Sequence, residues 1–249
     1  MIANKLVNSV NGPMIINSND QYIGRSKELT GGWAIDDVAL IESFCEIILA
    51  DKGSMRLYDV GANIGSHTVA LAKKFADRIA VRSFEAQRQV YYMLCGNVAM
   101  NGLDNVHCEY AAVSDGSRDS LSIALPDYNK FNNFGGLELI APKISDNQNM
   151  IKNLHETVKC VTLDSYGEDV DFVKMDIEGM EHLALAGAKN LLMKSRPVCF
   201  VEMGKTDTEA VKSVFRDADY IAFEYNSNDW IFCPRESDYE IEGHERIVL

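Results

Sequence analysis

The stretch "LYDVGANIGSHTVALAKKFA", residues 57–76, constrains the fold more than any other part of the chain. An apolar run passes through Asp59, Gly61, Asn63 and Gly65 before a helical pattern begins. Glycine permits a tight turn and lets a ligand approach the backbone, and the helix that follows begins with free N–H groups. This pattern predicts a strand, a ligand-binding turn and a helix, with a tight turn that binds nothing as the alternative.

The turn departs from the dinucleotide fingerprint G-x-G-x-x-G, which would need glycine at positions 63 and 66 when counted from Gly61. The chain has Asn63 and Ser66 at these positions. The pattern D-x-G-x-N-x-G instead matches the form D/E-x-G-x-G-x-G that holds S-adenosylmethionine, with asparagine in the middle place. An acidic residue at the head of such a turn, here Asp59, can meet the ammonium group of that ligand.

Strand-like and helical segments alternate along most of residues 51–249, which predicts a mostly parallel sheet with helices on both faces. The alternation breaks at about residues 115–160, where Asn, Asp, Ser and Gly are frequent and we expect an inserted β-hairpin. Two apolar segments near the end of the sequence predict a terminal antiparallel hairpin. We expect residues 1–50 to form an extension of strands and a helix that packs on this α/β domain.

Acidic residues stand at the ends of several predicted strands, where ligands bind in sheets of this kind. Glu85 follows the second strand, 20 residues after Gly65, and is placed to accept both hydroxyls of a ribose. Asp176 and Glu178 follow "VDFVKM", and Glu202 follows "PVCFV". A glutamate after an apolar strand is costly unless it faces a polar cleft, although Asp176 and Glu178 can also complement a helix dipole.

Composition excludes some partners and indicates a compartment. The chain has 37 acidic and 24 basic residues, and this net charge of −13 argues against binding nucleic acid. Its six cysteines form no C-x-x-C pair, which predicts reduced, buried thiols in a cytoplasmic protein. We find no leader and no apolar run of membrane length, so we expect no membrane partner. The oligomeric state stays open, with a dimer as one possibility.

Five segments together resemble the FkbM-type methyltransferase family over about residues 55–205: "YDVGANIGSHTVALAK", "SFEAQRQVYYMLCGNVAMNGL", "NNFGGLEL", "VDFVKMDIEGMEHLALAGA" and "PVCFVEM". The resemblance implies a class I Rossmann-like methyltransferase fold with a seven-stranded sheet. It also implies S-adenosylmethionine as the cofactor, and O-methylation of a sugar or other small secondary-metabolite hydroxyl as the reaction. One departure is Ala86, where many members of the family carry proline.

The resemblance assigns roles to the residues already singled out. It places a first group on the cofactor: Asp59, Gly61, Asn63 and Gly65, with Glu85 on the ribose. It places Asp176 near the sulfonium as well as near the acceptor, with Glu178 beside it. A hydroxyl is a poor nucleophile unless its proton is removed during attack, so we consider Asp176, Glu178 and Glu202, in that order, as the catalytic base. His67, in the first helical turn after the glycines, is a further candidate for lining the cofactor site.

Two other functions remain open at this point. An NAD-dependent oxidoreductase shares the alternation and Glu85, but the failed dinucleotide fingerprint opposes it. A non-catalytic protein that binds S-adenosylmethionine would keep the same motifs. The oxygen atoms of Asp176, Glu178 and Glu202 are of the kind that Mg²⁺ or Ca²⁺ accepts, yet their spacing does not require a metal and we predict none.

Overall fold

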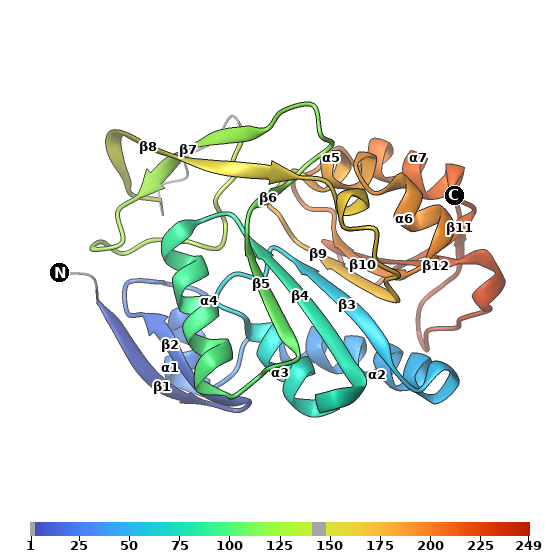
Figure 1. The fold of residues 1–249 in the computed structure, drawn as a ribbon, viewed down its shortest axis with the longest axis horizontal. Helices are drawn as coiled ribbons and strands as arrows, with labels where there is room; N and C mark the ends of the chain where they lie inside the picture. The colour runs from blue at the N-terminus through green and yellow to red at the C-terminus, as the bar shows by residue number, and fades with distance from the viewer. Residues whose placement is uncertain (1–2, 141–147) are drawn as a thin grey trace.

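The computed structural model describes residues 3–140 and 148–249 of the chain. In these residues the central sheet has the strand order β13-β11-β12-β10-β9-β3-β4-β5 (Figure 1). Its strands are β3 (Met55–Val60), β4 (Ile79–Glu85), β5 (Val106–Tyr110), β9 (Phe172–Met175), β10 (Val198–Glu202), β11 (Tyr220–Glu224), β12 (Asp229–Pro234) and β13 (Ile247–Val248).

Neighbouring strands from β5 to β10 run parallel, whereas β12 runs antiparallel to both β10 and β11. This confirms the mostly parallel sheet and the terminal antiparallel hairpin. The predicted number of seven strands is too low, because β13 pairs antiparallel with β11 and adds an eighth at the edge. A strand of two residues is too short to leave a periodic pattern in the sequence.

Helices cover both faces of the sheet (Figure 1). The α-helices are α1 (Ile23–Thr30), α2 (Ile35–Lys52), α3 (Ser66–Phe75), α4 (Arg88–Met100), α5 (Glu181–Ala186), α6 (Lys189–Lys194) and α7 (Thr208–Asp217). Short 3-10 turns are η1 (Ala76–Arg78), η2 (Leu163–Tyr166) and η3 (Arg235–Ser237).

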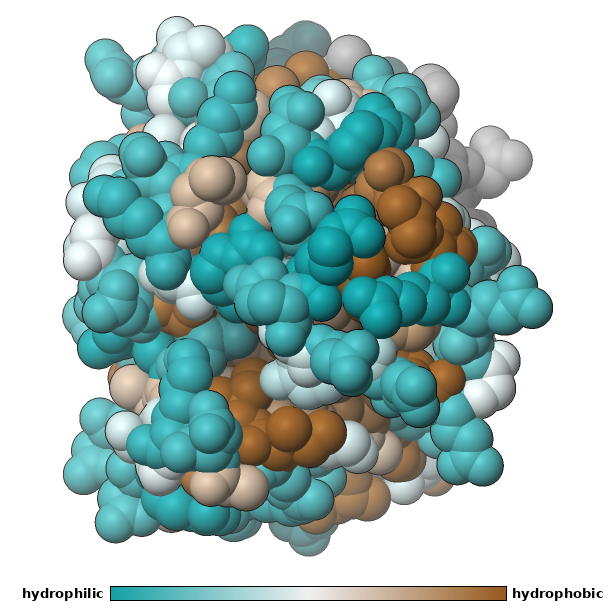
Figure 2. Space-filling model, turned by 90° about the vertical axis from the view of Figure 1, so that its right-hand side faces the viewer, coloured by the Kyte–Doolittle hydropathy of each residue, from teal (hydrophilic) through white to brown (hydrophobic). Residues whose placement is uncertain are grey.

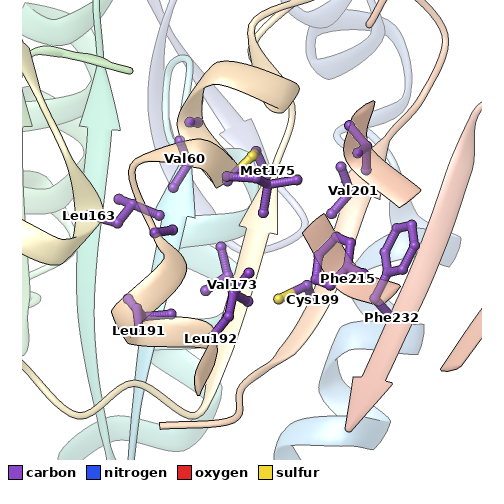
Figure 3. Close-up of a cluster of buried hydrophobic side chains, with 14 of the residues drawn as sticks. Val60, Leu163, Val173, Met175, Leu191, Leu192, Cys199, Val201, Phe215 and Phe232 are labelled. Carbon is purple, nitrogen blue, oxygen red and sulfur yellow. The ribbon is translucent and has the colours of Figure 1, made fainter. Parts of the chain in front are cut away.

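Two hydrophobic cores hold these layers together, because successive side chains of a strand point to opposite faces of the sheet. Leu57 and Phe172 pack toward α2 and α3 on one face. Val60 and Val173 pack on the other face, in the cluster that contains Phe215 of α7 (Figure 3). Burial on both faces explains why these strands are continuous apolar runs rather than alternating patterns.

The N-terminal residues form an antiparallel hairpin of β1 (Asn4–Ser9) and β2 (Gly12–Asn17). The hairpin is tied to α4 by Asn97, whose side chain accepts from Ile15 N at 2.5 Å and donates to Ile15 O at 3.2 Å. Helix α1 follows and packs against both strands of the hairpin. The sequence pattern predicted strands here but did not predict α1.

The insertion contains β7 (Ser120–Pro126) and β8 (Met150–Val161), which pair antiparallel as the predicted hairpin. The short β6 (Ala112–Val113) joins β8 in parallel and completes a three-stranded sheet above the central one (Figure 1). The strand-like segment "GLELI", residues 136–140, forms no strand. Part of the predicted insertion, residues 141–147, lies outside the described residues.

The surface is mainly polar on the face that Figure 2 shows, with hydrophobic side chains gathered in small separate patches. In the described ranges, no helix combines the length and the apolar character that crossing a membrane requires.

Candidate active site

A large cavity opens at the carboxyl ends of β3, β4, β9 and β10, where the parallel strands place their following turns side by side. The insertion contributes Asn133, Gly135, Gly136, Leu137 and Leu139 to its wall, and Tyr22, Ile23 and Trp33 contribute from the N-terminal part. Of the nine residues predicted for the site, all but Asp59 and Gly65 line this cavity. The structure therefore brings together most of the residues that the strand ends indicated.

The two glycines of the turn after β3 are required by close packing. Gly61 has φ +80°, and a Cβ atom there would lie 1.7 Å from the carbonyl oxygen of Asp176. Gly65 has φ +89°, and a Cβ atom would lie 2.7 Å from Leu94 Cδ1. The alternative of a tight turn thus accounts for both glycines, although Gly61 also faces the cavity.

Asp59 lies beneath the turn and is fully buried. Its Oδ2 accepts a hydrogen bond from Thr68 Oγ1 at 2.6 Å, and its Oδ1 lies 3.4 Å from the Nζ atom of the buried Lys174. Lys174 also donates to Gly61 O at 2.9 Å. The carboxylate of Asp59 is turned to Thr68 and Lys174 and supports the turn from below, and its contact with the ligand stays a prediction.

Lys174 keeps its charge in this buried position. Burial lowers the pKa of Lys174, but the carboxylates of Asp59 and Asp176 outweigh burial and raise the pKa above its ordinary value. The Nζ atom of Lys174 lies 3.9 Å from Asp176 Oδ2, so it connects the support of the turn with the acidic side of the cavity.

Glu85 is buried at the end of β4 and faces the cavity. Its Oε1 accepts from Gln87 N at 2.7 Å, and its Oε2 accepts from Asn63 N at 3.0 Å. Burial raises the pKa of Glu85 to about 7, although these two N–H groups act in the opposite direction. Each carboxylate oxygen can accept a second hydrogen bond, so both remain available to ligand hydroxyls.

Ser66 and His67, in the first turn of α3, present polar atoms to the cavity without partners. Within residues 3–140 and 148–249, no hydrogen bond reaches Ser66 Oγ or His67 Nε2, and both atoms are buried. Burial, followed by the charge of Lys174, lowers the pKa of His67 to about 4, so its ring is neutral. Buried polar atoms without partners are uncommon in proteins and indicate a place that a ligand or water fills.

The acidic side of the cavity consists of Asp176, Glu178 and Glu202. Glu178 forms an ion pair with Lys205, and burial together with Asp176 raises the pKa of Glu178 to about 7. Glu202 has a buried Oε2 that no described residue contacts by a hydrogen bond, and burial raises the pKa of Glu202 to about 9, with Asp176 and Glu178 adding to the effect. Asp176 has a side chain that is 44% exposed, which leaves its carboxylate the most open of the three.

A cation could also be held at this side. Oxygen atoms of Asp176, Glu181 and Glu202 lie within 4.8 Å of one another, and oxygen donors are what Mg²⁺ and Ca²⁺ prefer. Glu181 is fully buried and already accepts hydrogen bonds from Ile177 N at 2.8 Å and Gly179 N at 3.0 Å. These hydrogen bonds show that Glu181 stabilises the turn after β9.

Sequence reasoning missed three residues of this site. Lys174 lies inside an apolar strand pattern. A lysine at such a position indicates a buried ion pair, because burying its charge requires an acidic partner. Glu181 is the last residue of the block K-x-D-I-E-G-x-E. Its position in this block does not show whether its carboxylate stabilises a turn or takes part in catalysis. Ser66 enters the sequence pattern only as a departure from the dinucleotide fingerprint, which carries no signal for a ligand contact.

The strand order, the helices on both faces and the cavity at the strand ends define a class I methyltransferase. The chain matches the family described as "Methyltransferase FkbM domain" over residues 59–222, and it belongs to that family. This membership confirms the predicted methyltransferase and its class of cofactor, S-adenosylmethionine, and leaves the oxidoreductase alternative without support.

Solved structures with the same kind of fold include a methyltransferase FkbM from Methylobacillus flagellatus KT, with a TM-score of 0.50 and 16% identity. That match covers 72% of this chain and 43% of the other, so this chain spans less than half of that protein. At this identity the likeness shows the fold alone. No curated protein matches the sequence.

Two further solved structures have lower TM-scores. M. jannaschii TYW2 in complex with AdoMet has a TM-score of 0.47 at 16% identity, with 93% of this chain and 84% of that chain covered. The Pyrococcus abyssi tRNA (uracil-54, C5)-methyltransferase in complex with S-adenosyl-L-homocysteine has a TM-score of 0.48 at 14% identity, with 93% and 44% covered.

Proposed function

We propose that this protein transfers the methyl group of S-adenosylmethionine to a hydroxyl group of a small polar or sugar-like acceptor. The observation that carries the proposal is the half-exposed carboxylate of Asp176, which lines the same cavity as Glu85 and the turn after β3. S-adenosylmethionine supplies a methyl group that is already activated on a sulfonium. The protein then has to align the acceptor, exclude water and remove one proton.

The cavity offers separate places for the parts of the cofactor. Glu85 is placed to accept hydrogen bonds from both ribose hydroxyls, as acidic residues at this strand end do in nucleoside-binding sheets. Apolar side chains beyond it, among them Val113 and Met180, suit an adenine ring. Asn63, whose N–H group donates to Glu85 Oε2, and His67 line the cavity too, and the methionine end would lie beside them, with Asp176 offering a negative charge to the sulfonium.

Asp176 is the base that we favour. Glu178 is engaged by Lys205, and a carboxyl group with a pKa of about 9, as in Glu202, carries its proton at neutral pH. When bound, S-adenosylmethionine would supply its methyl group to the acceptor oxygen and keep the electrons of its carbon–sulfur bond. The hydroxyl proton passes to the carboxylate of Asp176. Glu202, still protonated, can donate a hydrogen bond to the acceptor.

The acceptor side of the cavity is polar and partly built by the insertion. Asn133, Gly135 and Gly136 line it, together with Trp33 and Tyr22 from the N-terminal part. Side-chain amides and aromatic rings are suited to a small polyhydroxylated compound. The net charge of −13 disfavours a nucleic-acid acceptor.

The direct test is a panel of sugars, aminosugars and other small hydroxyl compounds, incubated with the purified protein and S-adenosylmethionine labelled with ¹³C in its methyl group. The proposal predicts S-adenosylhomocysteine together with a product whose labelled carbon shows the NMR shift of a methoxy group. A labelled carbon bonded to nitrogen or to carbon would contradict O-methylation. The Asp176→Asn variant serves as the control for catalysis by the protein itself.

A further inference from the structure

We propose that Lys27, together with the first turn of α3, forms a subsite for a carboxylate, namely the carboxylate at the amino-acid end of the cofactor. Lys27 would thereby set the preference of the protein for a cofactor that carries this group. The inference rests on the proposal that the cofactor lies in the cavity at the strand ends. It does not depend on which acceptor is methylated.

The first observation is that α3 begins without a cap. Its N-cap residue is Gly65, which offers no side chain, and among the described residues no acceptor is found for the backbone N–H groups of Ser66, His67 and Thr68. The start of a helix carries a partial positive charge and attracts anions. An open helix start at the wall of a cavity is suited to a carboxylate.

The second observation is independent of the helix and concerns the side chain of Ser66. Ser66 is only 5% exposed, it lines the cavity, and its Oγ has no partner in the part of the chain that the structure describes. A buried hydroxyl without a partner costs free energy. The hydroxyl would regain a hydrogen bond by donating to an oxygen atom of a ligand that binds at the start of α3.

The third observation is the charge of Lys27. This residue is 1% exposed, and within residues 3–140 and 148–249 no hydrogen bond or ion pair involves its Nζ atom. Burial lowers the pKa of Lys27 to about 8. A buried ammonium group without a counter-ion is strongly unfavourable, and such groups in proteins are normally paired. An anion that arrives from outside the chain would supply the missing partner.

Lys27 lies on the side of α1 that approaches the cavity. It follows Ile23 by one helical turn, so both residues share the buried face of α1, and Ile23 lines the cavity. The charge of Lys27 also acts on His67: burial first and then Lys174 lower the pKa of that histidine, Asp59 and Asp176 oppose them, and Lys27 adds a smaller lowering. The ammonium group therefore acts on the same first turn of α3.

The distribution of charge in the cavity selects the amino-acid end of the cofactor as the occupant. Asp176 lines the cavity with a carboxylate that suits the sulfonium, whereas the start of α3, which also lines the cavity, suits a carboxylate together with the charge of Lys27. The methionine-derived part of the cofactor has both a sulfonium and a carboxylate. An acceptor with a carboxylate would have the same chemistry, and the experiment below separates the two sources.

The experiment is titration calorimetry with three ligands: S-adenosylhomocysteine, its decarboxylated analogue S-adenosyl-3-thiopropylamine, and 5′-methylthioadenosine, which lacks the whole amino-acid part. Each is titrated into the wild type, Lys27→Met and Lys5→Met. Lys5 is an exposed residue of β1 that pairs with Glu28, so its variant removes one positive charge from the same N-terminal part. Thermal unfolding of each variant without ligand is measured in parallel.

We expect the wild type and Lys5→Met to bind S-adenosylhomocysteine at least about tenfold more tightly than the decarboxylated analogue, as a charge-assisted hydrogen bond would give. In Lys27→Met this difference should fall to less than about threefold, with unchanged binding of 5′-methylthioadenosine. The ligand-free Lys27→Met protein should melt at the same or a higher temperature, because an unpaired buried charge is gone.

Unchanged preference for the carboxylate in Lys27→Met would overturn the inference, and would leave an acidic acceptor as the partner of Lys27. If the wild type binds none of the three ligands, the proposal of a cofactor in this cavity fails as well, so the two failures are distinguishable. Should Lys27→Met not fold, Ser66→Ala replaces it. That variant must also lose preference for the carboxylate, and an unchanged preference there counts against the subsite.

Discussion

Lys174 and Asp59 form a buried ion pair, with Nζ 3.4 Å from Oδ1, between the end of β9 and the turn after β3. The same ammonium group donates to Gly61 O at 2.9 Å and lies 3.9 Å from Asp176 Oδ2. One side chain thus fixes the turn proposed for the cofactor relative to the carboxylate proposed as the base. Methyl transfer needs these parts in line, so this pair is a structural condition for the reaction.

The first prediction concerns that ion pair. Lys174→Met leaves Asp59 buried without its counter-ion and should lower the free energy of unfolding by about 3–5 kcal/mol. Lys52→Met is the matched control: it breaks a pair with Asp171 in which the lysine side chain is 51% exposed, and it should cost less than about 1 kcal/mol. Urea unfolding of both variants measures the difference. An equal loss of unfolding free energy in the two variants would contradict the larger stabilising role that we assign to the buried pair.

The second prediction concerns the close approach at Gly61. Gly61→Ala would place a Cβ atom against the carbonyl oxygen of Asp176 and should lower the free energy of unfolding by more than about 3 kcal/mol, or prevent folding. Gly53 has a similar φ of +78° with no atom within 4 Å of a built Cβ, so Gly53→Ala isolates the backbone strain. That control should cost about 1–2 kcal/mol. A Gly61→Ala protein as stable as the Gly53→Ala protein would contradict the packing that we describe.

The third prediction separates the candidate bases. Asp176→Asn keeps the shape of the side chain but cannot take a proton, so turnover with an accepted substrate should fall by about 10²–10⁴-fold. Affinity for S-adenosylhomocysteine should change by less than about threefold, because this product carries no sulfonium charge. Glu202→Gln, measured alongside, should retain turnover within about tenfold. A larger loss in Glu202→Gln than in Asp176→Asn would transfer the role of base to Glu202.

The fourth prediction follows from the raised pKa of Glu202. Its pKa of about 9 in the folded protein lies above the ordinary value of 4.5, so between these two pH values the folded state holds a proton that the unfolded state releases. The contribution of Glu202 to stability is therefore full below about pH 4.5 and is lost as the pH rises toward 9. Urea unfolding at pH 5, 7 and 9 measures this change.

Glu202→Gln cannot titrate and removes this dependence. The free energy of unfolding of the wild type minus that of Glu202→Gln should decrease steadily from pH 5 to pH 9. Because Glu85 and Glu178 are present in both proteins, their own titration cancels in the difference. A difference that stays constant, or that increases with pH, would show that Glu202 is ionised in the folded protein.

Reasoning from the sequence found the acidic residues of the site because of how parallel sheets are built. Glu85, Asp176, Glu178 and Glu202 each follow an apolar strand, and the carboxyl ends of parallel strands meet at one edge of the sheet. Their convergence required no knowledge of side-chain positions. The parallel direction of the central strands followed from the same alternation of strands and helices.

Other features depend on packing that the pattern of residues does not reveal. Asp59 heads the turn motif, but its burial against Thr68 and Lys174 is a product of tertiary structure. Lys27 belongs to α1, a helix of only eight residues, and a lysine in a short polar segment is typical of the surface. Its burial arises only when α1 packs beside β1 and β2.

The central claim is that the cavity binds S-adenosylmethionine with its ribose at Glu85. Titration calorimetry of S-adenosylhomocysteine and NADH, with the wild type, Glu85→Ala and Glu209→Ala, tests it most directly, since the Glu209 side chain is 74% exposed on α7 and serves as the control. We predict micromolar binding of S-adenosylhomocysteine, at least about tenfold weaker in Glu85→Ala and unchanged in Glu209→Ala, as loss of hydrogen bonds to a charged group implies. Tighter binding of NADH, or equal affinity of all three proteins for S-adenosylhomocysteine, would contradict the assignment.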